Sequence, residues 1–236
     1  MLTYIQPFDE IDSFPPLEKA ESFPNGLLAI GGDLSAQRLL HAYQRGIFPW
    51  FSENEMIQWW SPDPRMVLYP REFHTSRSLK KSIRKNDFEY SVDQVFEDVI
   101  QACSEPRDSQ QGTWITSEMK QAYTDLHQSG KAHSVEIWKD NQLAGGLYGI
   151  AIGQVFFGES MFSRVTDASK AAFLILTRIL SENGFQLIDC QVYSQHLESL
   201  GAREIDRRVF EKELQQYCTA EKGRLTAITP QRLSLK

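Results

Sequence analysis

Three apolar stretches in the middle of the sequence restrict the possible folds more than any other feature. They cover residues 133–139, 143–152 and 154–159, and the turn-forming pair Asp140-Asn141 joins the first two. Apolar segments with such short connections predict a meander of adjacent strands. Residues 168–180 follow as the most apolar segment with helical periodicity, which predicts a helix buried against that sheet.

Helical periodicity also marks the segments that flank the meander. Residues 76–86, 91–103 and 117–129 are predicted helices, and 187–193 is a predicted strand, followed by a short helix and a last helix at 210–218. A chain with this order of elements is expected to form an α+β fold, with a mixed sheet covered by helices. The order is similar to that of the acetyltransferase-type fold called GNAT.

Residues 1–65 differ from the rest in composition. They hold seven of the ten prolines and three of the five tryptophans. Ser35 is placed to cap a short helix that runs through Tyr43, and Gly46 is placed to end it; the remainder reads as loop. We therefore expect a small N-terminal α/β domain over residues 1–65 and a larger GNAT-like domain over residues 66–236.

Composition indicates a globular protein of a reducing compartment. The three cysteines, Cys103, Cys190 and Cys218, form no CxxC pair, and their odd number argues against a disulfide framework. No apolar run approaches the ~18–20 residues that span a bilayer, and the N-terminus has no signal-peptide pattern. A cytoplasmic location is the simplest interpretation.

The distribution of charge points to a polyanion. The chain carries a net charge of −6, yet six cations and one acid lie between Arg71 and Lys85. On a helix, five of these cations share one face, while Leu79 and Ile83 share the opposite face. The five are Arg77, Lys80, Lys81, Arg84 and Lys85. A charge run is often only a solvated surface, but a stripe of cations without an acid favours nucleic-acid binding.

Eight ordered stretches together resemble one family, the leucyl/phenylalanyl-tRNA–protein transferases. They are PNGLLAIGGDLS (24–35), YQRGIFPWF (43–51), WWSPDPR (59–65), GTWIT (112–116), GKAHSVEIW (130–138), GGLYGIAIG (145–153), VFFGESMFSR (155–164) and LIDCQVYSQHLESLGA (187–202). The resemblance extends from about residue 24 to about residue 210. It implies an aminoacyltransferase that moves Leu, Phe or Met from aminoacyl-tRNA to proteins beginning with Arg or Lys, which marks them for N-end rule degradation.

The implied reaction makes modest chemical demands. An ester is exchanged for an amide, so the reaction runs downhill without ATP, and the chain has no GxxxxGK[ST] motif. The attacking α-amine has a pKa of roughly 7.7–8.0, so the enzyme needs positioning, a proton acceptor and stabilisation of the oxyanion. No cofactor is expected, and the family is expected to act as a monomer.

Three polar residues in apolar strands are candidates for that chemistry. Asp189 and Gln191 are two residues apart on a predicted strand and so share a face, while Ile188, Cys190 and Val192 face the core. The resemblance implies that Asp189 and Gln191 are catalytic. It also implies that Glu159, at the predicted end of its strand, is an active-site acid, which would hold either the α-ammonium or the Arg/Lys side chain of the acceptor; which acid has which role stays open. Whether Asp189 is a general base or an orienting residue stays open at this point, as does a purely structural role.

The resemblance also implies substrate contacts. Leu147, Met161, Ser163 and Leu176 would line an aminoacyl pocket, in which Leu147 and Leu176 replace the Met and Phe of other members. Trp50 and Trp114 would contact the 3′-adenosine of the tRNA, because aromatic faces stack on any base. Trp59 and Trp60 are better explained by packing, and the five cations would bind the tRNA backbone.

Two other functions are compatible with parts of the sequence. A CoA-dependent N-acetyltransferase would need a glycine-rich turn, but residues 163–169 lack its first glycine and add Asp167. A non-catalytic RNA-binding adaptor would explain the basic stripe but not the inward-facing acids. The histidines are scattered without an i, i+4 pair, so no metal site or Cys/His nucleophile is expected.

Overall fold

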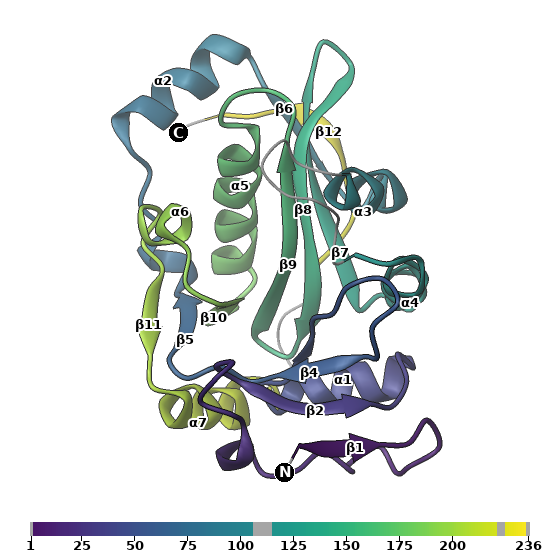
Figure 1. Ribbon diagram of the computed structural model, residues 1–236. Helices are drawn as coiled ribbons and strands as arrows, with labels where there is room; N and C mark the ends of the chain where they lie inside the picture. Colours follow the sequence, from purple (N-terminus) through teal and green to yellow (C-terminus); the bar gives the residue numbers. More distant parts are fainter. Residues whose placement is uncertain (1, 106–114, 221–224, 235–236) are drawn as a thin grey trace.

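Two β-sheets and seven α-helices make up the described part of the chain (Figure 1). The computed structural model describes residues 2–105, 115–220 and 225–234. The smaller sheet has the order β1 (Thr3–Ile5), β2 (Leu27–Gly31), β4 (Gln58–Trp60), β3 (Phe48–Pro49). The larger has the order β11 (Arg203–Ile205), β5 (Arg65–Leu68), β10 (Leu187–Gln191), β9 (Val155–Ser163), β8 (Gln142–Ile152), β7 (Ala132–Lys139), β6 (Glu89–Val92), β12 (Ile228–Arg232).

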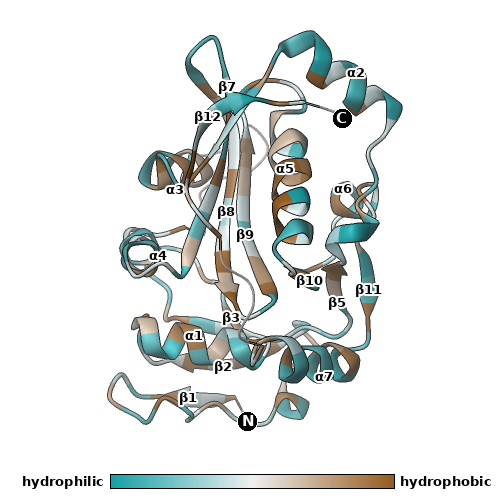
Figure 2. Ribbon diagram, turned by 180° about the vertical axis from the view of Figure 1, so that it is seen from behind, coloured by the Kyte–Doolittle hydropathy of each residue, from teal (hydrophilic) through white to brown (hydrophobic). Residues whose placement is uncertain are grey.

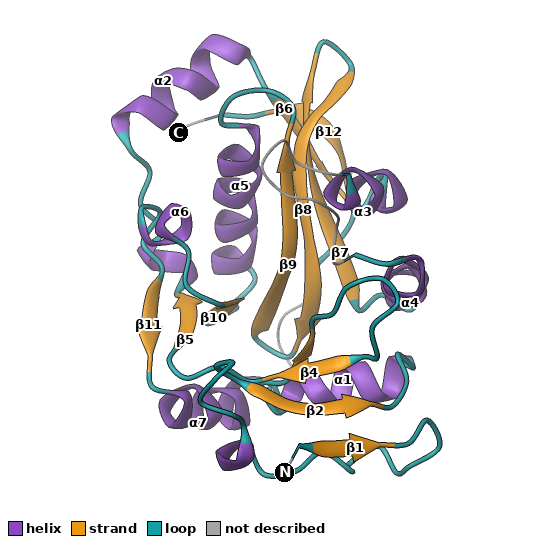
Figure 3. Ribbon diagram, viewed as in Figure 1, coloured by secondary structure: helices purple, strands orange, loops and turns teal. Residues whose placement is uncertain are grey.

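The helices cover both faces of the larger sheet. They are α1 (Ala36–Gln44), α2 (Arg77–Asn86), α3 (Phe96–Ser104), α4 (Ser117–Gln128), α5 (Ala168–Glu182), α6 (Gln195–Glu198) and α7 (Arg207–Tyr217), with 3-10 turns η1 (Leu17–Lys19) and η2 (Pro70–Glu72). Helix α5 lies on one face, and α3 and α4 lie on the other (Figure 3). In the larger sheet β9 and β10 pair in parallel and the remaining pairs are antiparallel. The predicted α+β class with a mixed, helix-covered sheet is confirmed.

Apolar side chains form two cores. One surrounds α5, which is banded with apolar residues in Figure 2, and extends to Leu79 and Ile83 of α2. The other joins α1, α3, α4 and α7 to the small sheet and to β8 and β9. This second core contains both Trp59 and Phe157, so the small sheet and the large sheet share one core. The division of the chain at residue 65 stays a prediction.

Several predicted elements match the structure closely. Ser35 caps α1 by accepting a hydrogen bond from the Arg38 N–H, and Ser76 caps α2 in the same way. Strands β7 and β8, their Asp140-Asn141 turn, α4 and α5 also lie where periodicity places them. No helix in the described ranges is long and apolar enough to cross a membrane.

Other predictions are wrong in ways that matter for the site. Residues 91–92 belong to β6, and α3 begins only at Phe96, because Asp93 adopts a left-handed conformation between them. Four segments of residues 1–65 that read as loop form the short strands of the small sheet. Strand β9 continues to Ser163, so Glu159 lies inside a strand and not at its end.

Candidate active site

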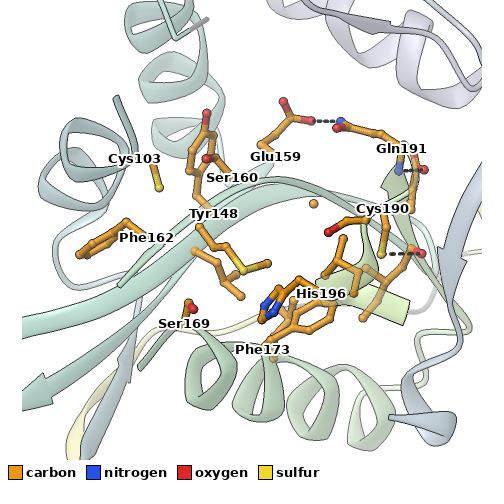
Figure 4. A pocket seen from close by; sticks show the side chains of 18 of the residues that line it. Cys103, Tyr148, Glu159, Ser160, Phe162, Ser169, Phe173, Cys190, Gln191 and His196 are labelled. Carbon is orange, nitrogen blue, oxygen red and sulfur yellow. Dashed lines mark hydrogen bonds between the residues drawn. The ribbon is translucent and has the colours of Figure 1, made fainter. Parts of the chain in front are cut away.

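The predicted catalytic and aminoacyl-pocket residues line one pocket of about 830 Å³, together with Trp50. It lies between β8, β9, β10, α5 and α6, and it reaches the small sheet at Phe48 and Pro49 of β3, next to Trp50. The predicted residues that line it are Trp50, Leu147, Glu159, Met161, Ser163, Leu176, Asp189 and Gln191. Residues up to 141 positions apart in the chain therefore meet at one place, part of which is shown in Figure 4. Trp114 lies outside the described residues.

The pocket opens where two parallel strands separate. Leu187, Ile188 and Asp189 of β10 pair with Val155, Phe156 and Phe157 of β9, and the pairing stops there. Strand β9 runs on for six residues, while β10 ends at Gln191 after a shift in its register with β5. Polar side chains that follow the last paired residues consequently project into the gap.

A β-bulge directs Glu159 into this gap. Tyr148 pairs with Ser160, and the next pair is Gly149 with Gly158, so Glu159 has no partner on β8. An extra residue of this kind turns a side chain away from its expected direction. Glu159 is only 8% exposed.

Three donors bind the Glu159 carboxylate. Its Oε1 accepts hydrogen bonds from the Tyr43 hydroxyl at 2.7 Å and the Gln191 amide at 2.9 Å. Its Oε2 accepts one from the Tyr123 hydroxyl at 2.8 Å. The two tyrosine hydroxyls also contact each other. Among the described residues no cation pairs with Glu159.

These surroundings favour the protonated form of Glu159. Burial raises the pKa of Glu159 to about 8, and the nearby Asp189 charge acts in the same direction, while the three hydrogen bonds oppose the rise. Burial also raises the pKa of Tyr43 and of Tyr123, so both tyrosines are neutral donors. A carboxyl with a pKa near neutrality is suited to exchanging a proton with an amine.

Asp189 is held in a buried ion pair. Its Oδ1 accepts from Arg65 Nε at 2.8 Å and its Oδ2 from Arg65 Nη2 at 2.6 Å. Neither side chain is accessible to solvent. Its Oδ1 also accepts from the Gln191 N–H at 2.9 Å. Both oxygens of Asp189 are thus bound by protein groups.

Gln191 reaches Glu159 through an irregular backbone. It has φ of 64°, in the left-handed region, and its side-chain amide donates a hydrogen bond to Glu159 (Figure 4). The predicted meeting of Asp189 and Gln191 therefore occurs, but regular strand alternation does not produce it. Val192, expected in the core, is 41% exposed, because the strand has already ended.

An apolar compartment adjoins the polar group. Leu147 and Leu176 are buried, and Met161, Phe173 and Ile188 line the same space. The Ser163 hydroxyl is used within the protein, since it donates to the Val165 carbonyl and accepts from the Ser169 N–H. The compartment can therefore hold an apolar side chain of a ligand next to Glu159.

Cys190 and His196 also line the pocket, but the thiol is not activated. Burial raises the pKa of Cys190, and the Asp189 charge raises it further. Burial lowers the pKa of His196. A thiol with a raised pKa is a weak nucleophile. Among residues 2–105, 115–220 and 225–234, no group of three or more His, Cys, Asp or Glu side chains could hold a metal ion.

Trp50 lines the pocket, whereas Trp59, Trp60 and the basic helix α2 do not. Trp50 is 42% exposed, and its ring lies 5.6 Å from that of Trp60. Trp59 is buried and donates to the Gly31 carbonyl, as expected for a packing role. Helix α2 presents all five predicted cations to solvent, and none pairs with an acid in the part of the chain that the structure describes. The α2 ribbon is accordingly hydrophilic over most of its length (Figure 2).

Three residues of the site are absent from the sequence-based prediction. Tyr43 and Tyr123 bind Glu159, and Arg65 binds Asp189. A helical tyrosine resembles any other core residue, so the sequence offers no signal for the first two. Arg65 does stand out, because it begins a strand that is otherwise apolar and fully buried.

Structural comparison finds only remote likenesses. A GCN5-related N-acetyltransferase from Kribbella flavida is 12% identical, with a TM-score of 0.36 over 70% of this chain and 58% of that chain. The L-PGS structure from Bacillus licheniformis is 10% identical, with a TM-score of 0.39 over 80% and 65% of the two chains. Likenesses at this level leave the chemistry of the pocket open.

Sequence comparison is far more specific. The family model described as leucyl/phenylalanyl-tRNA protein transferase matches residues 67–215, and the model of its N-terminal domain matches residues 32–63. Relatives named leucyl/phenylalanyl-tRNA–protein transferase include those of Nitrosomonas europaea (62% identical over 86% of both chains) and Azotobacter vinelandii (60%; 84% of this chain, 88% of the relative). That of Pseudomonas aeruginosa is 56% identical over 92% of this chain and 95% of its own length. The chain belongs to the leucyl/phenylalanyl-tRNA–protein transferase family.

Proposed function

We propose that this chain transfers Leu, Phe or Met from aminoacyl-tRNA to the α-amino group of proteins that begin with Arg or Lys. The family name specifies an aminoacyl-tRNA donor and a protein acceptor. The observation that carries the proposal is the buried Glu159 carboxyl, bound by Tyr43, Tyr123 and Gln191 beside an apolar compartment. It combines a proton acceptor for an amine with a space for a large apolar side chain.

The donor amino acid occupies the apolar compartment. Leu147, Met161 and Leu176 form its walls, with Ser163 at one end. An apolar pocket separates ligands by only ~1–3 kcal/mol per methylene, so one pocket accepts several large apolar side chains. The exposed Trp50 stacks on the terminal adenosine, and Trp114, outside the described residues, is proposed to do the same.

The acceptor amine loses its proton to Glu159. An incoming ammonium has a pKa of roughly 7.7–8.0. The pKa of Glu159 is about 8, because the carboxyl is buried. Transfer of one proton from nitrogen to the Glu159 carboxylate replaces two charges by two neutral groups, which the buried site favours. Glu159 thus delivers the neutral nucleophile.

Bond formation then needs alignment and little else. The amine nitrogen attacks the ester carbonyl carbon, the bond between that carbon and the ribose oxygen breaks, and the surplus proton on nitrogen passes to the ribose oxygen. Gln191 orients Glu159 and the amine, while Asp189 orients Gln191 through its backbone N–H. Alignment of this kind supplies much of the acceleration of such transfers.

The wider roles follow from the resemblance. The basic face of α2 binds the tRNA backbone without reading its sequence, which suits an enzyme that accepts several tRNAs. The products are proteins marked for N-end rule degradation in the cytoplasm. The enzyme acts as a monomer, and its two parts divide near residue 65.

A transfer assay tests the proposal directly. Radiolabelled Leu-tRNA is incubated with a peptide that begins with Arg, and label in the peptide is measured, with a Met-initiated peptide and acetyl-CoA as controls. We expect label only in peptides that begin with Arg or Lys. Binding of tRNA without transfer would leave an RNA-binding adaptor, and acetylation of the peptide would indicate a CoA-dependent enzyme.

A further inference from the structure

Arg65 is a buried cation that lies outside the pocket yet is connected to it. It is fully inaccessible to solvent, and its guanidinium lies 4.7 Å from the ring centre of Phe48 and 4.8 Å from that of Phe210. A buried charge is costly unless it is paired. Aromatic faces offset part of that cost by attracting the cation.

The guanidinium in turn fixes the orientation of one carboxylate. Two parallel hydrogen bonds, from Nε and Nη2 to the two oxygens of Asp189, set the plane of the carboxylate. Such a fork imposes a direction that a single lysine ammonium does not impose. The direction matters here, because Oδ1 of Asp189 also accepts the Gln191 N–H.

That last hydrogen bond stabilises an unfavourable backbone conformation. Gln191 has φ of 64°, which residues with a side chain rarely adopt. A strained conformation persists only where its surroundings hold it. With the backbone held in this way, the Gln191 amide lies 2.9 Å from Oε1 of Glu159. A continuous series of contacts thus joins Arg65 to Glu159.

We propose that Arg65 is a positioning residue for aminoacyl transfer, which fixes the left-handed turn at Gln191 through Asp189 and so presents the Gln191 amide to Glu159. The inference rests on the proposed function, since it assigns a role in that reaction. It also assigns Asp189 to orientation, because both of its oxygens are bound by protein groups, Oδ1 by Arg65 and Gln191 and Oδ2 by Arg65. Arg65 itself does not line the pocket.

Loss of Arg65 has a defined effect on the pH dependence. The hydrogen bond from Gln191 lowers the pKa of Glu159, and the charge of Asp189 raises it. Removal of Arg65 releases the Gln191 contact, and the loss of that hydrogen bond raises the pKa of Glu159. The acid limb of the kcat profile should therefore move to higher pH, which a loss of folded protein alone would not cause.

The experiment compares four variants with the unmodified chain. Arg65→Met and Arg65→Lys remove the fork while Asp189 remains, and Arg65→Met with Asp189→Leu replaces the buried pair by apolar residues. Arg203→Met is the matched control, since this arginine lies on the adjacent strand and also packs on an aromatic ring, but is exposed. The measurements are kcat, KM for Leu-tRNA, the pH profile and Tm.

We expect kcat to fall about 100-fold in both single variants, because misplacement of a reacting group by about 1 Å has that effect. KM for Leu-tRNA should not change, and the acid limb should move to higher pH. The double variant should recover Tm, since apolar replacement of a buried ion pair is often neutral, while its kcat stays low. Arg203→Met should change none of these quantities.

Three results would overturn the inference. Recovery of kcat together with Tm in the double variant would make the pair a structural contact only. Full activity in Arg65→Lys would show that a positive charge beside Asp189 is sufficient and that the two parallel hydrogen bonds from the guanidinium are not required. An unmodified chain that fails to transfer leucine would overturn the proposed function and the inference with it, whereas the first two results leave the proposed function intact.

Discussion

At the scale of single residues, Glu159 lies in surroundings that disfavour its charge. Tyr43, Tyr123 and Gln191 donate to it, yet no cation in the described residues pairs with it, and burial dominates. The folded chain therefore binds this proton more tightly than the unfolded chain does. A residue that serves catalysis in this way reduces the stability of the protein.

The stability cost of Glu159 should depend on pH. Its pKa is raised from 4.5 to about 8 on folding. The free energy of unfolding should fall as pH rises through that interval, by up to about 5 kcal/mol, because each pKa unit corresponds to about 1.4 kcal/mol. Glu159→Gln carries no charge at any pH. Thermal unfolding of the two proteins between pH 4.5 and 9 should show a Tm difference in favour of the variant that grows up to about pH 8; a constant difference would contradict this account.

The donor preference should respond to one pocket wall. Leu176 lines the pocket, whereas Leu174, on the same helix and equally buried, does not. Truncation to Ala at either position should cost about 2–5 kcal/mol of stability. Only Leu176→Ala should raise kcat/KM for Phe-tRNA relative to Leu-tRNA, by about 10-fold, because it enlarges the space for the side chain. If the ratio of kcat/KM for Phe-tRNA to that for Leu-tRNA were the same in both variants, the aminoacyl side chain would bind elsewhere.

Charged residues in apolar strands were the part of the site that could be predicted. Glu159 and Asp189 interrupt runs of buried residues, and a buried carboxylate calls for an explanation. Tyr43 and Tyr123 carry no comparable signal, because a tyrosine on an amphipathic helix has the same pattern as any core residue. Their hydroxyls meet Glu159 only after α1 and α4 pack against the sheet.

At the scale of elements, α2 combines an anchored face with a free one. Leu79 and Ile83 are buried in the core around α5, and the five cations are exposed. Periodicity predicts both faces, and the Ser76 cap fixes the start of the helix. The helix thus offers a rigid row of charges at little cost in stability.

The row of charges should govern the salt dependence of tRNA binding. Lys81→Gln should reduce the slope of log Kd against log salt concentration by about 0.7–0.9, the value for loss of one phosphate contact. Lys212→Gln, an exposed lysine of α7, removes the same charge elsewhere on the molecule. Binding of Leu-tRNA by both variants should be measured from 50 to 300 mM salt, a range of the order used for such slopes. If the two variants had identical slopes, α2 would not be part of the tRNA-binding site.

The irregular elements are those that sequence cannot reveal. The bulge at Glu159 and the left-handed Gln191 break the alternation on which strand prediction depends. Short edge strands such as β11 and β12 are missed by sequence-based prediction for a different reason. They are three and five residues long, and they exist because a neighbouring strand offers unpaired backbone groups, not because of their own side chains.

At the scale of the whole molecule, the site depends on contacts between distant parts of the chain. Arg65 and Asp189 are separated by 124 residues, and Phe210 of α7 completes the aromatic surroundings of Arg65. Gly46 lies against this helix, and a Cβ there would meet the Phe210 ring at 2.9 Å. Local periodicity predicts the helices but carries no information about such pairings.

A pair of glycine substitutions should separate crowding from backbone strain. Gly46 and Gly130 have similar φ values, 75° and 69°, but no atom lies within 4 Å of a Cβ at Gly130. Both changes to Ala should cost about 1–2 kcal/mol for the left-handed backbone. Gly46→Ala should cost a further 1–3 kcal/mol or so for overpacking, and should lower kcat by displacing Phe210. Equal effects on Tm and kcat would mean that α7 tolerates the displacement.

The position of Phe210 also has a consequence for synthesis. Chains emerge from the ribosome N-terminal part first, and folding follows that order. The small sheet, β9 and β10 all precede α7, so the pocket walls become available earlier than the ring that confines Arg65. A nascent chain with its aminoacyl compartment already formed would still lack the aromatic surroundings of Arg65 until residue 210 has left the exit tunnel. A chain that is still being synthesised therefore becomes active only after translation has passed α7.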